Sequence, residues 1–180
     1  MSTVLEAPER AVVEHDRTAF NLAVWDKIAA NPDFARIPYR FETDEHGQII
    51  MSPPPAPSHG RSQVHLGTLL QRHAPPGEVV SECLISTRKG VKAADVVWCS
   101  PEVWRESEGK SCLLRAPEIC IEILSPSNTT GEIEEKKQLY FDAGAKEVWL
   151  CAEDGALSFF LPGAPSPASL LCPDFPTRID

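Results

Sequence analysis

PEICIEILSP, residues 117–126, is the stretch of sequence that decides the fold of this chain. Its apolar run has the length of a β-strand, is rich in β-branched isoleucine, and is bounded by proline on both sides. Alternate side chains of a strand point to opposite faces of the sheet, so the three isoleucines would share one face. Glu122 would share the other face with Cys120 and Leu124.

Glu122 is the anomalous residue of this run. An ionised and unpaired carboxylate in a low-dielectric interior costs several kcal/mol, so a buried glutamate pairs with a cation, binds a metal or becomes protonated. An edge strand that leaves Glu122 in water is the alternative. The flanking isoleucines favour burial, and we therefore treat Glu122 as a functional candidate.

Asp95 is a second carboxylate inside an apolar strand, predicted over residues 92–98. If the two strands are adjacent, Asp95 and Glu122 can lie roughly 5 Å apart on one side of the sheet. Two carboxylates that close repel unless a proton or a cation lies between them. Ligation by oxygen atoms suits Mg²⁺ or Mn²⁺, which can polarise a phosphodiester and activate water. The alternative is chance, because two unrelated acidic residues in two strands would give the same sequence pattern.

A lysine on a predicted helix completes this set. The helix runs from Thr130 to Asp142, with Ile133 and Tyr140 on its inward stripe and Lys136 and Lys137 between them. The ammonium of an inward lysine could stabilise negative charge on a phosphorus undergoing attack. A lysine that packs its stem and keeps its charge in water is the alternative.

The other predicted elements suit a single α/β or α+β domain. The sequence predicts a mixed central sheet flanked by helices, after an N-terminal helix over residues 18–30 and a hairpin over residues 39–51. A second helix over residues 58–73 and strands over residues 78–85, 92–98, 146–151 and 157–161 follow from their apolar patterns. We expect a flexible leader over residues 1–16, the domain over residues 17–161 and a Pro-rich tail over residues 162–180.

Composition narrows the function class. The chain has 180 residues, 42% of them hydrophobic, and a net charge of −9, which does not suggest non-specific nucleic-acid binding. Its six cysteines form no CxxC pair, which argues against structural zinc and favours reduced thiols. No signal peptide and no apolar run of membrane-spanning length is present, so we expect a soluble cytoplasmic protein.

Asp95 followed by Glu122-Ile123-Leu124 resembles the PD-(D/E)XK nuclease superfamily, which has the restriction-endonuclease-like fold. A longer match, over roughly residues 39–161, resembles the bacterial "putative restriction endonuclease" family called Uma-two. Its segments are, in order, Ile49-Ile50-Met51-Ser52-Pro53-Pro54, His59, Asp95-Val96-Val97, Glu122-Ile123-Leu124-Ser125-Pro126-Ser127, Lys136 with Tyr140, Gly144, and Glu147-Val148-Trp149-Leu150.

The resemblance implies roles for particular residues. Asp95 and Glu122 would bind a metal, with the backbone carbonyl of Ile123 as a third ligand. The lysine of the superfamily would fall at Leu124, which is apolar here, and the resembling family supplies it instead from the following helix, at Lys136. Ala94 stands where that family has proline before the aspartate.

Secondary candidates lie outside this set. Glu42 is a further acid that could lie near the metal, although a glutamate in a hairpin is more often solvated. His59 could contact a phosphate or orient a water, and a helix-capping or exposed role for it is at least as common. Residues 59–92 hold five basic and two acidic residues, the one basic stretch of the chain. Its candidates for nucleic-acid binding are Arg61, Arg88, Lys89 and Lys92.

Taken together, the sequence and the resemblance predict a Mg²⁺- or Mn²⁺-dependent endonuclease that hydrolyses phosphodiester bonds of DNA, and the resemblance implies a homodimer. The alternative is a weak or inactive nuclease-fold protein that acts as a binding or assembly module, favoured by the acidic charge and the displaced lysine. An enzyme acting on a smaller phosphate ester is a third reading.

Overall fold

A six-stranded mixed sheet forms the centre of the computed structural model, which describes residues 9–126 and 128–179. The strand order is β3-β4-β5-β6-β7-β8, and every neighbouring pair is antiparallel except β5 and β6, which are parallel. The strands are β3 (Glu78–Thr87), β4 (Gly90–Cys99), β5 (Ile119–Ile123), β6 (Glu147–Cys151), β7 (Leu157–Leu161) and β8 (Ala164–Ser166).

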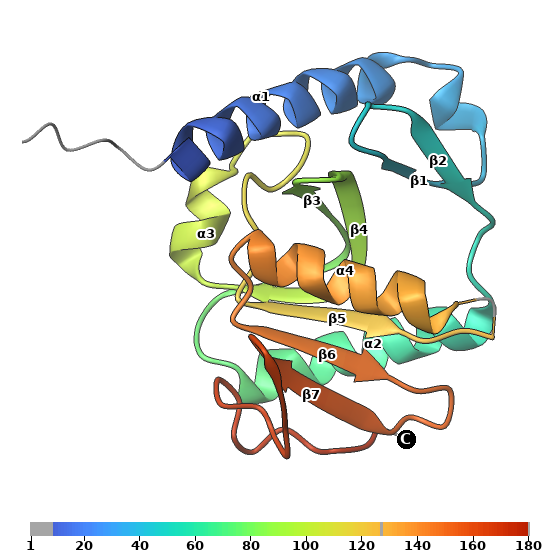
Figure 1. Ribbon diagram of the computed structural model, residues 1–180. Helices are drawn as coiled ribbons and strands as arrows, with labels where there is room; N and C mark the ends of the chain where they lie inside the picture. Colours follow the sequence, from blue (N-terminus) through green and yellow to red (C-terminus); the bar gives the residue numbers. More distant parts are fainter. Residues whose placement is uncertain (1–8, 127, 180) are drawn as a thin grey trace, which may run out of the picture.

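Two helices cover opposite faces of this sheet (Figure 1). Helix α2 (Pro57–His73) buries Leu66 and Leu70 in an apolar cluster with Val96 and Ile121. Helix α4 (Thr130–Asp142) joins β5 to β6, as a parallel pair requires, and buries Tyr140 in a second cluster on the other face. The sheet is therefore buried on both sides at β4 and β5.

The N-terminal elements lie against the far end of the β3–β4 hairpin (Figure 1). They are α1 (Glu9–Ala30), a short 3₁₀ turn η1 (Phe34–Arg36), and a separate two-stranded sheet of β1 (Arg40–Thr43) and β2 (Ile49–Ser52). A short helix, α3 (Pro101–Glu106), follows β4. Trp25 and Ile28 of α1 form a third apolar cluster with Val91 of β4.

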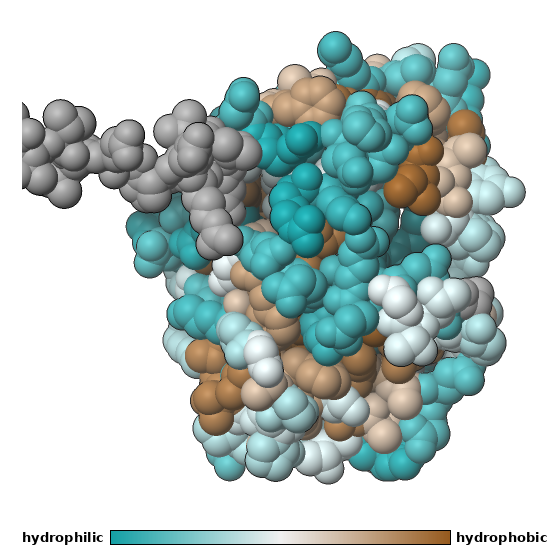
Figure 2. Space-filling model, in the orientation of Figure 1, coloured by the Kyte–Doolittle hydropathy of each residue, from teal (hydrophilic) through white to brown (hydrophobic). Residues whose placement is uncertain are grey.

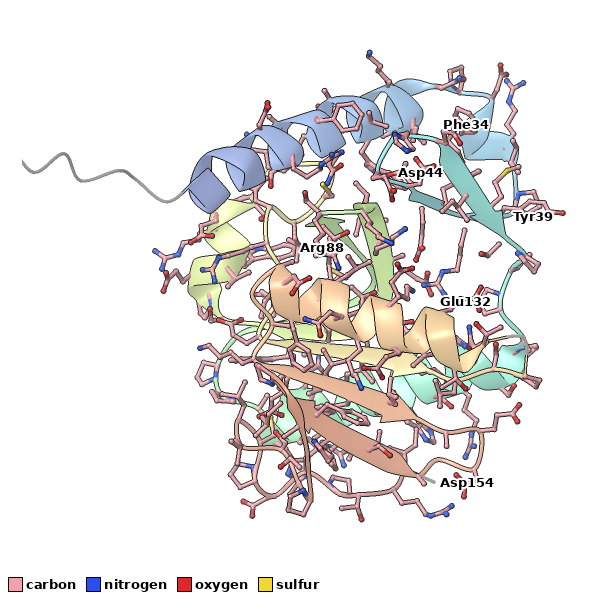
Figure 3. The ribbon with its side chains drawn as sticks, viewed as in Figure 1. Phe34, Tyr39, Asp44, Arg88, Glu132 and Asp154 are labelled. Atoms are coloured by element: carbon pink, nitrogen blue, oxygen red, sulfur yellow. The ribbon has the colours of Figure 1, made fainter. Side chains whose placement is uncertain are left out.

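Several contacts fix the turn between β3 and β4. Asn21 of α1 donates to Ser86 Oγ at 2.8 Å, and Lys89 pairs with Glu135 of α4. Arg88 pairs with Asp142, the last residue of α4, at 2.7 Å (Figure 3). This end of the hairpin therefore contacts both α1 and α4.

Strand β4 leaves β5 part of the way along its length. It pairs with β3 from Gly90 to Cys99, except where Asp95 lies opposite Glu82, but it pairs with β5 only from Val96 to Trp98. On the N-terminal side of Val96, β4 separates from β5. There the Asp95 carboxylate accepts a hydrogen bond from the backbone N–H of Ile123 at 2.7 Å. We call this separation the fork.

The expected fold class, a mixed central sheet flanked by helices, is confirmed. The space-filling view shows a mainly hydrophilic surface along α4, with hydrophobic residues below it over β6 and β7 (Figure 2). All six cysteines are free and buried. Among the described residues, no helix combines the length and the apolar character needed to cross a membrane.

The ends of the chain differ from the expected boundaries. Helix α1 already begins at Glu9, and residues 1–8 lie outside the described part of the chain. Residues 164–166 form β8, and the Pro-rich segment after it buries Cys172, Phe175 and Ile179 in the cluster of α2. Proline prevents regular structure there, but these apolar side chains still hold the segment against the sheet.

Candidate active site and metal centre

At the fork, backbone N–H and C=O groups of β4 have no partner on β5 and form hydrogen bonds with side chains instead. The Ala93 carbonyl accepts from Lys136 Nζ at 3.0 Å and from Arg40 Nη2 at 3.3 Å. The Ala93 N–H donates to Glu42 Oε1 at 3.0 Å. Since buried peptide groups need partners, the fork brings charged side chains from β1 and α4 to one point of β4.

Asp95 is 1% exposed and uses both of its carboxylate oxygens. Besides the Ile123 N–H on Oδ2, Oδ1 accepts from Arg40 Nη1 at 2.8 Å. His59 Nε2 lies 3.1 Å from the same oxygen but lacks the alignment of a hydrogen bond. Burial alone would raise the pKa of Asp95, but His59, Arg40 and the Ile123 N–H outweigh it and hold this pKa below its ordinary value.

Glu122 is 5% exposed and lies at the centre of a second group of contacts. The Tyr140 hydroxyl donates to Oε1 at 2.6 Å, and Lys136 Nζ lies 3.2 and 3.1 Å from the two carboxylate oxygens. Lys136 Nζ also pairs with Glu42 Oε1 at 3.0 Å. The inward direction expected for Lys136 is the one observed.

Burial has opposite consequences for the two partners of this ion pair. It raises the pKa of Glu122 to about 7, with Lys136 acting against the shift and Asp95 adding to it. It lowers the pKa of Lys136, but the carboxylates of Glu122, Glu42 and Asp95 outweigh burial and raise that pKa above its ordinary value. Lys136 therefore keeps its positive charge.

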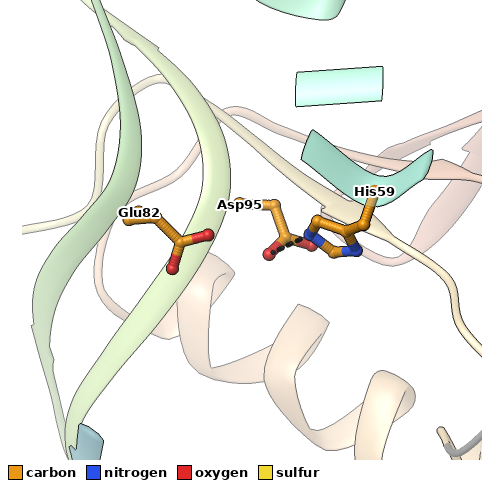
Figure 4. Close-up of side chains that lie close together, drawn as sticks. All are labelled: His59, Glu82 and Asp95. Carbon is orange, nitrogen blue, oxygen red and sulfur yellow. Dashed lines mark ion pairs between the residues drawn. The ribbon is translucent and has the colours of Figure 1, made fainter. Parts of the chain in front are cut away.

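Three possible metal ligands, His59, Glu82 and Asp95, meet beside these contacts, each offering one atom within 4.8 Å of the others. They come from α2, β3 and β4 and converge on one point (Figure 4). Glu82 has φ +51°, a left-handed conformation that is uncommon outside glycine and occurs where the β3–β4 ladder is interrupted. The irregular backbone lies directly at the candidate site.

This arrangement fits a divalent cation. Asp95, Glu82 and Glu122 supply the carboxylate oxygens that Mg²⁺ and Mn²⁺ prefer. His59 Nε2 lies 3.1 Å from Asp95 Oδ1 but makes no aligned hydrogen bond among the described residues, so this nitrogen is a possible further ligand. The imidazole of His59 favours Mn²⁺ over Mg²⁺ at the group of ligands formed by His59, Glu82 and Asp95.

The fork brings together most of the residues singled out in the sequence. Asp95, Glu122 and Lys136 lie in one network, which also takes in the backbone N–H of Ile123 and the secondary candidates Glu42 and His59.

The four basic residues predicted to bind nucleic acid do not lie together at the fork. Arg88 and Lys89 pair with acids of α4, and Lys92 is 8% exposed with its ammonium bonded to the Thr43 carbonyl at 2.8 Å. Arg61 is exposed on α2.

Two residues of the site, Glu82 and Arg40, are not among those predicted from the sequence. The two-residue turn at Arg88-Lys89 pairs Thr87 with Gly90, and counting back along that register places Glu82 opposite Asp95. That signal is present in the sequence. Arg40 has no comparable signal, because packing of the β1–β2 sheet against β4 brings it there.

A sequence model of the Uma2 family, described as "Putative restriction endonuclease", matches residues 31–170. The structure is similar to the crystal structure of a putative nuclease belonging to DUF820 from Anabaena variabilis, with a TM-score of 0.60 and 20% sequence identity. That likeness covers 74% of this chain and 79% of the other, and it shows a shared fold. Among curated proteins, none matches this chain.

Proposed function

The chain belongs to the Uma2 family of putative restriction endonucleases, and on this premise we propose that it is a divalent-metal-dependent endonuclease that hydrolyses phosphodiester bonds. The observation that carries the proposal is the buried network at the fork, where Asp95, Glu122 and Lys136 meet. An apolar strand core that keeps two carboxylates and an ammonium in contact has the charge pattern of a phosphoryl-transfer site.

Asp95 and Glu122 would hold the cation, with the Ile123 carbonyl as a further ligand. When bound, the cation withdraws charge from the phosphoryl oxygens and lowers the pKa of a water molecule. Lys136, charged and held by Glu42 and the Ala93 carbonyl, stabilises the negative charge that grows on the phosphoryl group. Tyr140 fixes the orientation of the Glu122 carboxylate through its 2.6 Å hydrogen bond.

Cleavage of plasmid DNA in Mg²⁺ or Mn²⁺ tests this proposal. We expect Glu122→Gln and Lys136→Ala each to lower the cleavage rate by about 10²–10³-fold, the usual loss when a charge-stabilising group is removed. Lys137→Ala is the matched control, since Lys137 lies on the same helix but pairs with Glu134 and the Phe160 ring. Equal cleavage by wild type and Glu122→Gln would remove the catalytic assignment.

The substrate, the assembly and the location belong to the same proposal. The restriction-endonuclease description of the family supports DNA as the substrate, with Arg61, Arg88, Lys89 and Lys92 as candidates for contact with it. The homodimer and the cytoplasmic location expected from the sequence stay proposals, which sedimentation and cell fractionation test.

One observation favours the second candidate function, a binding module without catalysis. Arg40 and Lys136 already neutralise Asp95 and Glu122 without any metal. Titration of the metal-free protein with Mn²⁺ in a calorimeter separates the two, because a binding module has no need of a cation at these carboxylates.

A further inference from the structure

Arg40 occupies the place between two of the three possible metal ligands. Its Nε atom lies 2.6 Å from Glu82 Oε2, and its Nη1 atom lies 2.8 Å from Asp95 Oδ1. His59 Nε2 approaches that same Asp95 oxygen. The guanidinium therefore supplies the positive charge that these carboxylates need in the metal-free protein.

A metal ion and this guanidinium would compete for the same carboxylate oxygens. Both are cations, and at contact distance in a partly buried site their repulsion is little screened. Arg40 is not closed off from solvent, since it begins β1 in the separate two-stranded sheet and 22% of its side chain is exposed. The adjacent Tyr39 is 48% exposed and points away from the molecule (Figure 3).

We propose that Arg40 is a resident counter-cation that leaves Glu82 and Asp95 when a divalent cation binds there, and that the released guanidinium then binds a phosphate of the nucleic acid. This rests on the proposed function. The planar guanidinium group matches the oxygens of a phosphate as well as those of a carboxylate, so the side chain would exchange one anionic partner for another. Metal and nucleic acid would then each increase the affinity for the other.

Calorimetric titration of the metal-free protein with Mn²⁺ tests the competition. We expect Arg40→Gln to bind Mn²⁺ roughly tenfold or more tightly than wild type, because the competing charge is gone. Arg72→Gln makes the same charge change at an exposed position of α2 and should leave the affinity unchanged. An Arg40→Gln protein that is folded by circular dichroism and binds Mn²⁺ no more tightly than wild type would overturn the proposal.

A second measurement uses the wild-type protein and does not depend on whether the variant folds. Phenylglyoxal modifies accessible guanidinium groups, and peptide mass spectrometry gives the rate at each arginine. We expect Mn²⁺ to accelerate the modification of Arg40 several-fold and to leave that of Arg72 unchanged. An unchanged rate at Arg40 in saturating Mn²⁺ would show that the side chain stays on its carboxylates and would refute the exchange.

The phosphate half of the proposal has its own readout. Ca²⁺ should increase the affinity of wild type for a fluorescein-labelled DNA oligonucleotide, measured by anisotropy, and Arg40→Gln should lose most of that increase. A full increase in Arg40→Gln would refute this half. If the protein cleaves DNA and Arg40 does not respond to metal, the exchange fails and the nuclease stands; if Arg40 responds and no cleavage occurs, the nuclease fails and the exchange stands.

Discussion

At the scale of single residues, Glu122 shows how burial and pairing act against each other on one carboxylate. Its strand places it in the interior, where ionisation is disfavoured, while Lys136 and Tyr140 direct positive charge and a hydroxyl at its oxygens. Burial prevails, and the pKa of Glu122 rises from 4.5 to about 7. The folded protein therefore binds a proton at this site more tightly than the unfolded chain does.

The free energy of unfolding of the metal-free protein should reflect this shift. Because the folded-state pKa is the higher one, the proton on Glu122 stabilises the fold below pH 4.5, and this stabilisation is lost as the pH rises to about 7. In EDTA, the stability of wild type relative to Glu122→Gln should fall by up to about 3 kcal/mol over that range and then level off. Urea denaturation at a series of pH values measures it.

Titrating groups remote from Glu122 are common to both proteins and cancel in the difference. Two stability curves that stay parallel from pH 4.5 to 8 would contradict the raised pKa.

At the scale of elements, the β3–β4 hairpin matters most, because it carries both Glu82 and Asp95. Its position depends on close approach at Gly90, which has φ +91°. A methyl group there would lie 2.4 Å from the carbonyl oxygens of Thr43 and Asp44. Glycine at this position lets the hairpin contact the end of β1 and the turn that follows it.

Gly90→Ala should therefore destabilise the protein by roughly 2 kcal/mol or more, through left-handed strain combined with a backbone clash. Gly109→Ala is the matched control. Gly109 has φ +73° but open space around its α-carbon, so only the conformational cost of about 1 kcal/mol applies. Thermal and urea denaturation give both values, and equal losses at the two positions would show that the close contact contributes nothing.

Particular elements show how far sequence reasoning reaches. Helix α4 has the predicted bounds, because Thr129 and Glu132 form a capping box before it and Gly144 follows it. Asp95, Glu122 and Lys136 could be selected because a charge in an apolar strand, or on an inward helix stripe, is itself unusual. Arg40 could not be selected, because an arginine at the start of a short strand is ordinary until tertiary packing carries it to Asp95.

At the scale of the whole molecule, the C-terminal segment closes the core. Glu147 is 1% exposed and its Oε1 atom accepts the N–H groups of Leu170 and Leu171, each at 2.8 Å. Phe175 packs on Trp149 of β6 with ring centroids 4.6 Å apart. The proline content of residues 162–180 predicts a separate tail, whereas the buried aromatic makes this segment part of the domain.

Phe175→Ala should cost about 3–5 kcal/mol, the range for removing a buried phenylalanine. Leu170→Ala, in the same segment but 66% exposed, should change the stability by no more than about 0.5 kcal/mol. Chemical denaturation compares the two variants with wild type. Similarly small losses for both would show that the segment behaves as an independent tail.

The fork has a consequence for how the protein is made. Its charged side chains span the chain from Arg40 to Lys136 and come from β1, α2, β3, β4, β5 and α4. A nascent chain that has left the ribosome only as far as β5 lacks the ammonium of Lys136 and the hydroxyl of Tyr140. The proposed active site can therefore be completed only after α4 has been synthesised, and a polypeptide that ends before Lys136 would lack the ammonium that the proposed cleavage requires.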